Sequence, residues 1–105
     1  MTRVYRLSRQ AESDLREIAR YIASDSPKSA GRVLEALRAA FRNLADRPEL
    51  GMLRGDPRPG LRLFVPRKPA HRYLIFYSPT DRGIEVLTVI HGARDWQSLF
   101  EGGER

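Results

Sequence analysis

Apolar residues recur with two different periods, which divide the chain into a helical N-terminal half and a β-rich C-terminal half. Val4–Leu7 favours a short strand. Two runs at helical spacing follow it. The first run is Ala11, Leu15, Ile18, Ala19 and Ile22, and the second is Ala30, Val33, Leu34, Leu37, Phe41 and Leu44. The pattern therefore predicts one strand followed by two amphipathic helices.

The residues around these runs predict where each helix begins and ends. Ser8 and Ser26 stand where an N-cap is needed, and Pro27 takes the first helical position, where its missing N–H costs nothing. The first helix is expected to end near Asp25, and the second at Arg47-Pro48, because the residue before a proline resists the helical conformation. The short connection at Ser26 predicts an antiparallel helical hairpin.

The C-terminal half predicts a loop and three strands. Pro48–Gly60 is rich in proline and glycine and reads as a loop. Strands are expected at Leu61–Val65, His71–Tyr77 and Ile84–Ile90, the last two joined by the turn SPTDRG. The order β-α-α-β-β-β describes one α+β domain over residues 1–105, with a helical hairpin packed on a small antiparallel sheet.

The two closing strands are apolar on both faces, although one helical hairpin covers only one face of a sheet. A register with Tyr77 opposite Glu85 gathers the polar groups on one face. It directs Leu74, Phe76, Ile84, Val86 and Ile90 to the helices. Tyr73, Ile75, Leu87 and Val89 then form a second face for a partner chain. Cover by the loop 48–60 and the C-terminal tail remains the alternative.

The chain carries 19 basic and 13 acidic residues, a net charge of +6. The segment 54–72 holds six basic residues against Asp56 alone, a net +5. Such a focused charge suits an acidic partner. Residues 54–63 contain no aromatic side chains on which nucleic-acid bases could stack, so direct nucleic-acid binding is not favoured.

The composition of the chain excludes several kinds of bond and binding site. There is no cysteine, which excludes disulfides and thiolate sites. The predicted register sets His71 near His91, but a metal needs a third ligand and none is evident, so no metal site or cofactor is predicted. No signal peptide or membrane-spanning run is evident, and a cytoplasmic protein is expected.

Several short motifs together resemble the ParE toxins of the ParE/RelE toxin–antitoxin superfamily. The opening Tyr5-Arg6-Leu7-Ser8, the segment Phe41–Ala45, the step Pro59–Arg62 and the closing stretches Tyr73–Tyr77 and Val89–Asp95 carry the resemblance. The resemblance implies the same β-α-α-β-β-β fold. It also implies a ParD-like antitoxin as partner and DNA gyrase as the target that the toxin poisons, with no cofactor.

RelE-like relatives instead cut messenger RNA in the ribosome, which is the alternative function. RNA cleavage needs a base, an acid and cations around the phosphate. His91 could serve as base or acid, Arg62 and Arg72 as the cations, and Tyr73 or Glu49 as partner. RelE-like ribonucleases share a cluster of lysines in the middle strands and a tyrosine near the C-terminus. This chain has no such cluster and no tyrosine after His91, so an inhibitor is favoured.

For the inhibitor, the expected contacts with the target are Arg62, Arg72, His91, Arg94 and Trp96. The expected contacts with the antitoxin are Tyr73, Ile75, Leu87 and Val89. A toxin that keeps its antitoxin but has lost its target is a further alternative.

Overall fold

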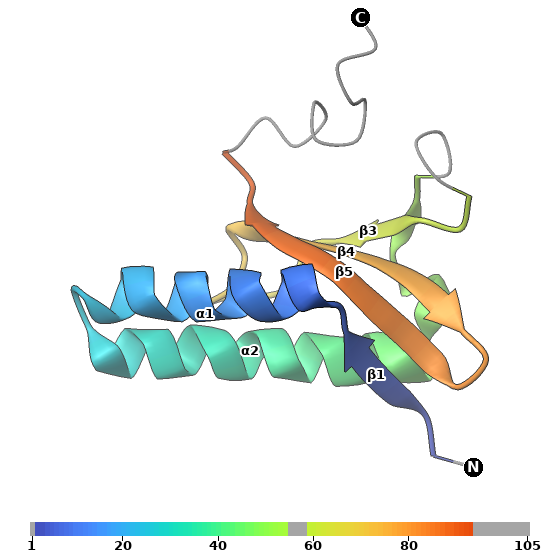
Figure 1. The fold of residues 1–105 in the computed structure, drawn as a ribbon, viewed down its shortest axis with the longest axis horizontal. Helices are drawn as coiled ribbons and strands as arrows, with labels where there is room; N and C mark the ends of the chain where they lie inside the picture. The colour runs from blue at the N-terminus through green and yellow to red at the C-terminus, as the bar shows by residue number, and fades with distance from the viewer. Residues whose placement is uncertain (1, 55–58, 94–105) are drawn as a thin grey trace, which may run out of the picture.

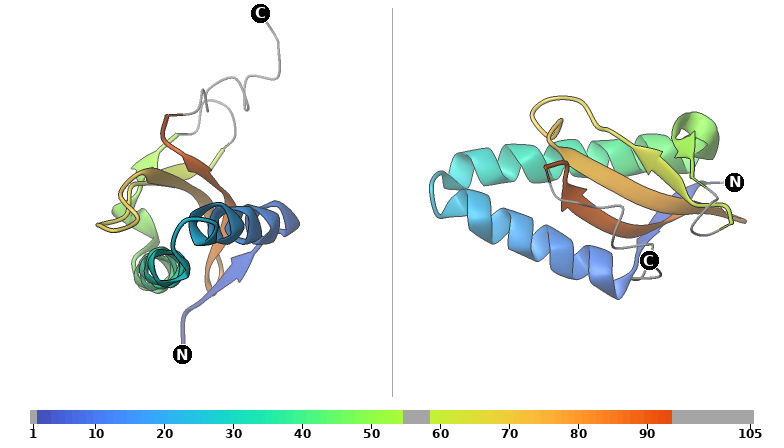
Figure 2. Two further views of the ribbon diagram at one scale, coloured as in Figure 1. Left: turned by 90° about the vertical axis from the view of Figure 1, so that its left-hand side faces the viewer. Right: turned by 90° about the horizontal axis from the view of Figure 1, so that it is seen from above.

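The computed structural model describes residues 2–54 and 59–93, and within these ranges two helices lie on one side of a five-stranded sheet (Figure 1). The elements in chain order are β1 Val4–Leu7, α1 Arg9–Ala23, α2 Pro27–Asp46, a 3-10 turn at Pro48–Leu50, β2 Met52–Leu53, β3 Arg62–Phe64, β4 Tyr73–Thr80 and β5 Gly83–His91. The α+β class is confirmed, as is the helical hairpin (Figure 2).

Both helices begin at the serines that the sequence indicated. The Ser8 hydroxyl accepts a hydrogen bond from the Ala11 N–H at 3.0 Å, and the Ser26 hydroxyl accepts one from the Ser29 N–H at 3.2 Å. Ser8 also reaches the sheet, because its hydroxyl donates to the Leu87 carbonyl at 2.8 Å. Its N–H donates to the Val86 carbonyl at 3.0 Å. The start of α1 is therefore fastened to β5 as well as capped.

The sheet is mixed, in the order β1-β5-β4-β3-β2, because the first strand runs parallel to the last while the other pairs are antiparallel. Gly83, at φ +152°, lies where β1 passes closest to β5, and a Cβ there would collide with the Val4 carbonyl. The two-residue strand β2 lies inside the segment that was predicted to be loop. It pairs with β3, so this segment extends the sheet by one edge strand.

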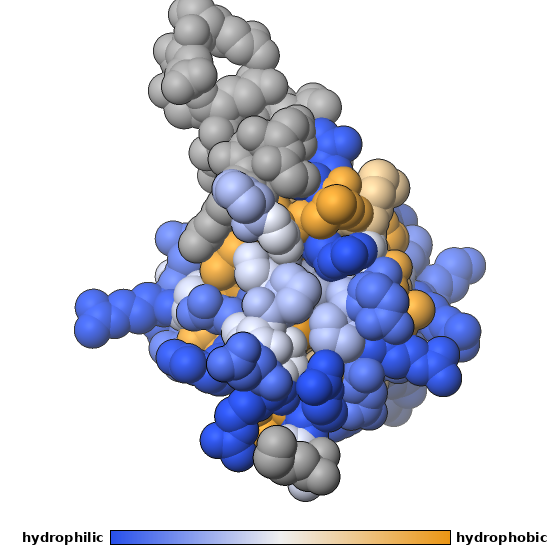
Figure 3. Space-filling model, turned by 90° about the vertical axis from the view of Figure 1, so that its right-hand side faces the viewer, coloured by the Kyte–Doolittle hydropathy of each residue, from blue (hydrophilic) through white to orange (hydrophobic). Residues whose placement is uncertain are grey.

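Within the described ranges, neither helix is long and apolar enough to cross a membrane. Seen from the side on which the β4–β5 turn lies, the surface is mostly polar and its apolar side chains form small, separate patches (Figure 3).

The register of the β4–β5 hairpin differs from the predicted one. β4 continues to Thr80, and the turn consists of Asp81 and Arg82 rather than six residues. Tyr77 lies opposite Val86 instead of Glu85, and a β-bulge follows, beyond which Phe76 lies opposite Thr88. A bulge places two residues of one strand against one of its partner, so it shifts the in-and-out alternation by one residue.

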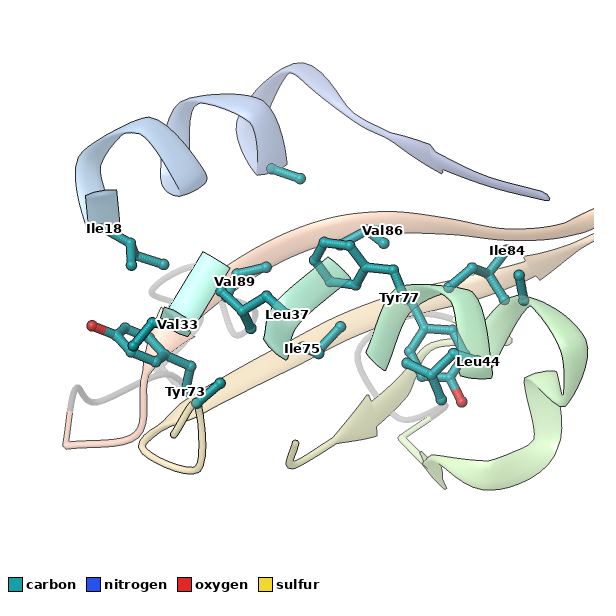
Figure 4. Packing of buried hydrophobic residues seen from close by; sticks show 14 residues of the cluster. Ile18, Val33, Leu37, Leu44, Tyr73, Ile75, Tyr77, Ile84, Val86 and Val89 are labelled. Atoms are coloured by element: carbon teal, nitrogen blue, oxygen red, sulfur yellow. The ribbon is translucent and has the colours of Figure 1, made fainter. Parts of the chain in front are cut away.

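The observed register and its bulge change which residues face the helices, relative to the prediction. Tyr73, Ile75 and Tyr77 pack against α1 and α2, together with Ile84, Val86 and Val89 (Figure 4). Leu74, Phe76, Leu87 and Ile90 lie in a second cluster with Leu61 and Leu63. The predicted faces of β4 were therefore reversed, and Val89 and Ile90 were exchanged. In β5 only Ile84, Val86 and Leu87 were assigned correctly, because two of them precede the shift and Leu87 lies within it.

Replacing Ser8 by alanine should cost more stability than the same change at Ser26. Ser8→Ala removes a cap of about 1 kcal/mol and the bond to Leu87, which adds about 1 kcal/mol. Ser26→Ala removes only a cap, so it is the matched control. Urea unfolding of both variants measures the difference, and equal losses would contradict the second role of Ser8.

Candidate functional site

Arg62 and Tyr77 lie opposite each other on β3 and β4 and together hold the segment that follows α2. The Tyr77 hydroxyl donates to the Pro48 carbonyl at 2.6 Å and accepts from the Gly51 N–H at 2.8 Å. The Arg62 guanidinium donates to the Gly51 carbonyl at 2.7 Å and to the Glu49 carbonyl at 3.3 Å. We call these four hydrogen bonds the loop clamp. Arg62 is thus occupied with the protein's own backbone.

His91 and Arg72 lie at the other end of the same two central strands. His91 is opposite Tyr73, and the two rings meet edge to face with centroids 5.4 Å apart. The Arg72 carbonyl accepts from the Gly92 N–H at 2.7 Å, which places Arg72 beside the end of β5. Both side chains are exposed, so they are free to contact another molecule.

An open groove of about 710 Å³ runs between α1 and this end of the sheet. Its lining is mixed in character and comes from both elements: Asp14, Glu17, Ile18, Arg20, Tyr21, Ser24, Tyr73, Val89, Ile90 and His91. Tyr21 is 78% exposed on its helix. The groove borders the part of β5 beyond Val86, which β1 does not reach.

Asp14 provides hydrogen-bond partners for the part of β5 that has no strand beside it. Its carboxylate accepts from the Val89 N–H at 2.9 Å and from the Thr88 hydroxyl. A side chain of α1 therefore replaces part of the hydrogen bonding that a neighbouring strand would provide. The sequence analysis did not identify Asp14 or Tyr77, because the pairing of α1 with β5 and the bulge are both long-range features.

The three candidate catalytic residues do not meet at one point. Arg62 aligns with Tyr77 and His91 with Tyr73, and at about 3.3 Å per residue these positions on β4 are about 13 Å apart. β3 and β5 also lie on opposite sides of β4. The structure thus brings Arg72 and His91 together and leaves Arg62 apart from them.

The tyrosine at this end is a poor proton acceptor near neutral pH. Burial raises the pKa of the Tyr73 hydroxyl above its ordinary value of 10.0, and the nearby Tyr21 raises it further, while Arg72 opposes both. Tyr73 therefore stays protonated at neutral pH. Glu49, the other residue expected to assist, is exposed and lies beside Arg62 rather than beside His91.

Three of the four expected antitoxin contacts are core residues, which corrects that expectation. Tyr73 is 8% exposed, Val89 2% and Ile75 0%. Tyr73 and Ile75 face the helices because the register is shifted by one residue from the predicted one, and the bulge at Leu87 turns Val89 to the same side. Only Leu87 lies on the second face and is half-buried. Arg94 and Trp96, two of the expected target contacts, lie outside the described residues.

The second face is still apolar and is built from other residues. Leu63, Leu74 and Leu87 are half-buried over a buried layer of Leu61, Phe76 and Ile90. Met52, opposite Leu63, is 62% exposed, and Val65, beyond β3, is 53% exposed. We call Met52, Leu63, Val65, Leu74 and Leu87 the open face. Neither α1 nor α2 packs on it.

Comparisons with known proteins agree with this architecture. The family model described as the ParE toxin of the type II toxin–antitoxin system parDE matches residues 5–96. A solved chain from the chromosomal ParDE system of P. aeruginosa superposes with a TM-score of 0.67 at 18% identity, covering 86% of this chain and 96% of that one.

Two further solved chains are similar at lower scores. One belongs to the YoeB–YefM complex from Staphylococcus aureus (TM-score 0.45, 20% identity, covering 87% of this chain and 98% of that one). The other belongs to the archaeal RelE–RelB complex from Pyrococcus horikoshii OT3 (TM-score 0.48, 22% identity, covering 90% and 99%). Among curated protein sequences there is no match.

The loop clamp predicts that Gly51 tolerates no side chain. A Cβ at Gly51 would lie 2.5 Å from the Tyr77 hydroxyl oxygen and 2.7 Å from its ring, so Gly51→Ala must displace a buried tyrosine. We expect a loss of about 1–3 kcal/mol of unfolding free energy. Gly31→Ala, within α2 and with no atom within 4 Å, is the control and should gain up to about 1 kcal/mol. Urea unfolding distinguishes the two, and a Gly51→Ala protein as stable as wild type would contradict the clamp.

The clamp also predicts instability in alkali. Burial raises the pKa of Tyr77 above 10.0, against the opposing effects of the Gly51 N–H and Arg62. The unfolded chain then releases this proton first, so stability is full below about pH 10 and falls as pH rises through the folded-state pKa. Urea unfolding from about pH 9 to pH 11 should show this fall, and a smaller one in Tyr77→Phe. Identical slopes in both proteins would contradict it.

Proposed function

The chain belongs to the ParE toxin family of type II toxin–antitoxin systems, and from this premise we propose that it stops growth by binding and poisoning DNA gyrase until a ParD-like antitoxin covers it. The family match over residues 5–96 carries the proposal, because it spans nearly the whole described fold. The fold of the P. aeruginosa ParDE chain supports it. The site of action would be the cytoplasm, where gyrase works.

The open face supports the antitoxin half of the proposal. It presents Met52, Leu63, Val65, Leu74 and Leu87, which the protein's own helices do not reach. A helix or strand of a partner could bury these side chains. Burial would contribute up to about 1.5–3 kcal/mol for each of the exposed Met52 and Val65 and less for the half-buried leucines, before the cost of association is subtracted. The net charge of +6 adds attraction for an acidic antitoxin. We therefore assign antitoxin binding to the open face.

Target contact is proposed for the exposed end of the sheet, at Arg72 and His91, with Arg94 and Trp96 further along the chain. Arginine and tryptophan side chains suit a protein-binding hot spot. Arg62 contributes indirectly, by holding the segment 48–51 through the loop clamp.

A ribosome-dependent ribonuclease of the RelE type is the alternative function. The separation of Arg62 from His91 speaks against it, because cleavage would need both at one phosphate. We therefore favour an inhibitor that acts by binding and is not an enzyme.

Purified protein should inhibit gyrase-catalysed supercoiling of relaxed plasmid, and adding the antitoxin should restore supercoiling. Double substitution Arg72→Ala/His91→Ala should weaken inhibition at least about tenfold, since several charged contacts of about 1–3 kcal/mol are lost. Arg32→Ala, at an exposed position on α2, is the charge-matched control for the loss of Arg72 and should leave inhibition unchanged.

Messages extracted after expression of the wild-type protein separate the two functions. We expect growth arrest without new cuts in messenger RNA. Cuts that disappear in the Arg72→Ala/His91→Ala variant, with gyrase unaffected, would replace the proposed function by the ribonuclease. Expression that does not slow growth would indicate a toxin that has lost its target.

A further inference from the structure

The loop between β3 and β4 gathers positive charge without any negative charge close to it in the sequence. Arg67, Lys68, His71 and Arg72 are all exposed. From Gly60 to Thr80 the chain contains no aspartate or glutamate. We call residues 66–72 the basic loop. The function proposed above uses only Arg72 of this loop and leaves the other three basic side chains unexplained.

The backbone of the basic loop is held in place at several points. Pro66 and Ala70 are buried, whereas Pro69 and the four basic residues of the loop are exposed. The Ala70 N–H donates to the Arg67 carbonyl at 2.9 Å, and the Tyr73 N–H donates to the Ala70 carbonyl at 3.1 Å. The bond from Gly92 to the Arg72 carbonyl joins the end of the loop to β5.

The basic loop projects from the body of the molecule and is accessible to a large partner. Figure 2 shows it, in yellow, standing out beyond the helices and the sheet in both views. His91, at the end of β5, lies beside Tyr73 where the loop rejoins the sheet, so a further basic side chain borders the same end. The arrangement presents the three charged side chains of Arg67, Lys68 and Arg72 in a short span of chain whose backbone is held by hydrogen bonds.

We propose that the basic loop, together with His91, binds the phosphate backbone of duplex DNA. Closely spaced arginine and lysine side chains are the usual donors to DNA phosphates, and such binding needs no base contacts. A single strand would require aromatic side chains for stacking, and the loop exposes none.

An acidic protein suits the basic loop less well than DNA does. Protein interfaces draw their binding free energy mainly from apolar and aromatic anchors, with charges adding rate and specificity. Of the loop's own apolar residues, Pro66 and Ala70 are buried and only the small ring of Pro69 is exposed. None of the large exposed apolar side chains in the described ranges lies within the loop, and two of them, Met52 and Val65, belong to the open face, which we assign to the antitoxin. The loop therefore presents charged side chains without a large apolar side chain that could anchor a protein partner.

The test measures binding of the full-length protein to a fluorescent 30-base-pair duplex by anisotropy, over a series of salt concentrations. Each phosphate contact contributes about 0.9 to the slope of log K against log salt. The variant Arg67→Gln/Lys68→Gln/Arg72→Gln should bind at least about tenfold more weakly at low salt and lower the slope by about 2 to 3. Circular dichroism melting verifies that the variant is folded.

The variant Lys28→Gln/Arg32→Gln/Arg38→Gln is the matched control. It removes the same three charges from exposed positions on α2 and should retain the affinity and the slope. An equal loss in this control would overturn the proposal, because net charge alone would then explain binding. A wild-type protein that does not bind the duplex would overturn it as well.

Competition identifies the kind of polyanion. Unlabelled duplex should displace the probe, whereas polyglutamate at the same charge concentration should not. Displacement by polyglutamate that the loop variant abolishes would assign the loop to an acidic protein and overturn the proposal. The assay contains no gyrase, so a failure of gyrase inhibition leaves this proposal standing, and a failure to bind DNA leaves the gyrase proposal standing.

Discussion

The β-bulge between Phe76 and Tyr77 is the feature on which the rest of the structure depends. It sets Tyr77 opposite Val86 on one side and Phe76 opposite Thr88 on the other. Because side chains alternate across a strand, this shift decides which apolar residues fill the core under the helices and which form the open face. Tyr77, on the β4 side of the bulge, points inward, where its hydroxyl is satisfied by the chain after α2.

The edges of the sheet are completed by side chains as well as by strands. Ser8, the N-cap of α1, and Asp14, in its second turn, bond to β5 beyond the end of β1. At the far side, Arg62 and Tyr77 hold the 48–51 segment that leads into the edge strand β2. These contacts join parts of the chain that are distant in sequence, so the helical hairpin and the sheet form a single unit. That unit leaves two features exposed, the open face and the basic loop.

Local patterns predicted the elements and long-range contacts decided their faces. The serine caps, Pro27 and the apolar spacing of the helices are local signals, and the boundaries they indicated are confirmed. The register was predicted wrongly because the apolar alternation in Tyr73–Tyr77 is equally compatible with either orientation. Nothing within Leu87–Val89 marks a bulge, and β2 is too short to leave a pattern. The clamp roles of Arg62 and Tyr77 depend on carbonyls that a sequence pattern does not display.

The central functional claim is that an apolar sheet face beyond the reach of both helices is reserved for the antitoxin. The chain has no cysteine, so single cysteines at Leu74 and Ile75 report on the two faces separately. The most direct measurement is the rate of thiol labelling of Leu74→Cys with and without bound antitoxin, with Ile75→Cys as the buried reference. We expect Leu74→Cys to be labelled readily in the free protein and protected in the complex, while Ile75→Cys is labelled slowly in both. Equal labelling rates of Leu74→Cys in the free protein and in the complex, whether slow or fast, would contradict the assignment of this face to the antitoxin.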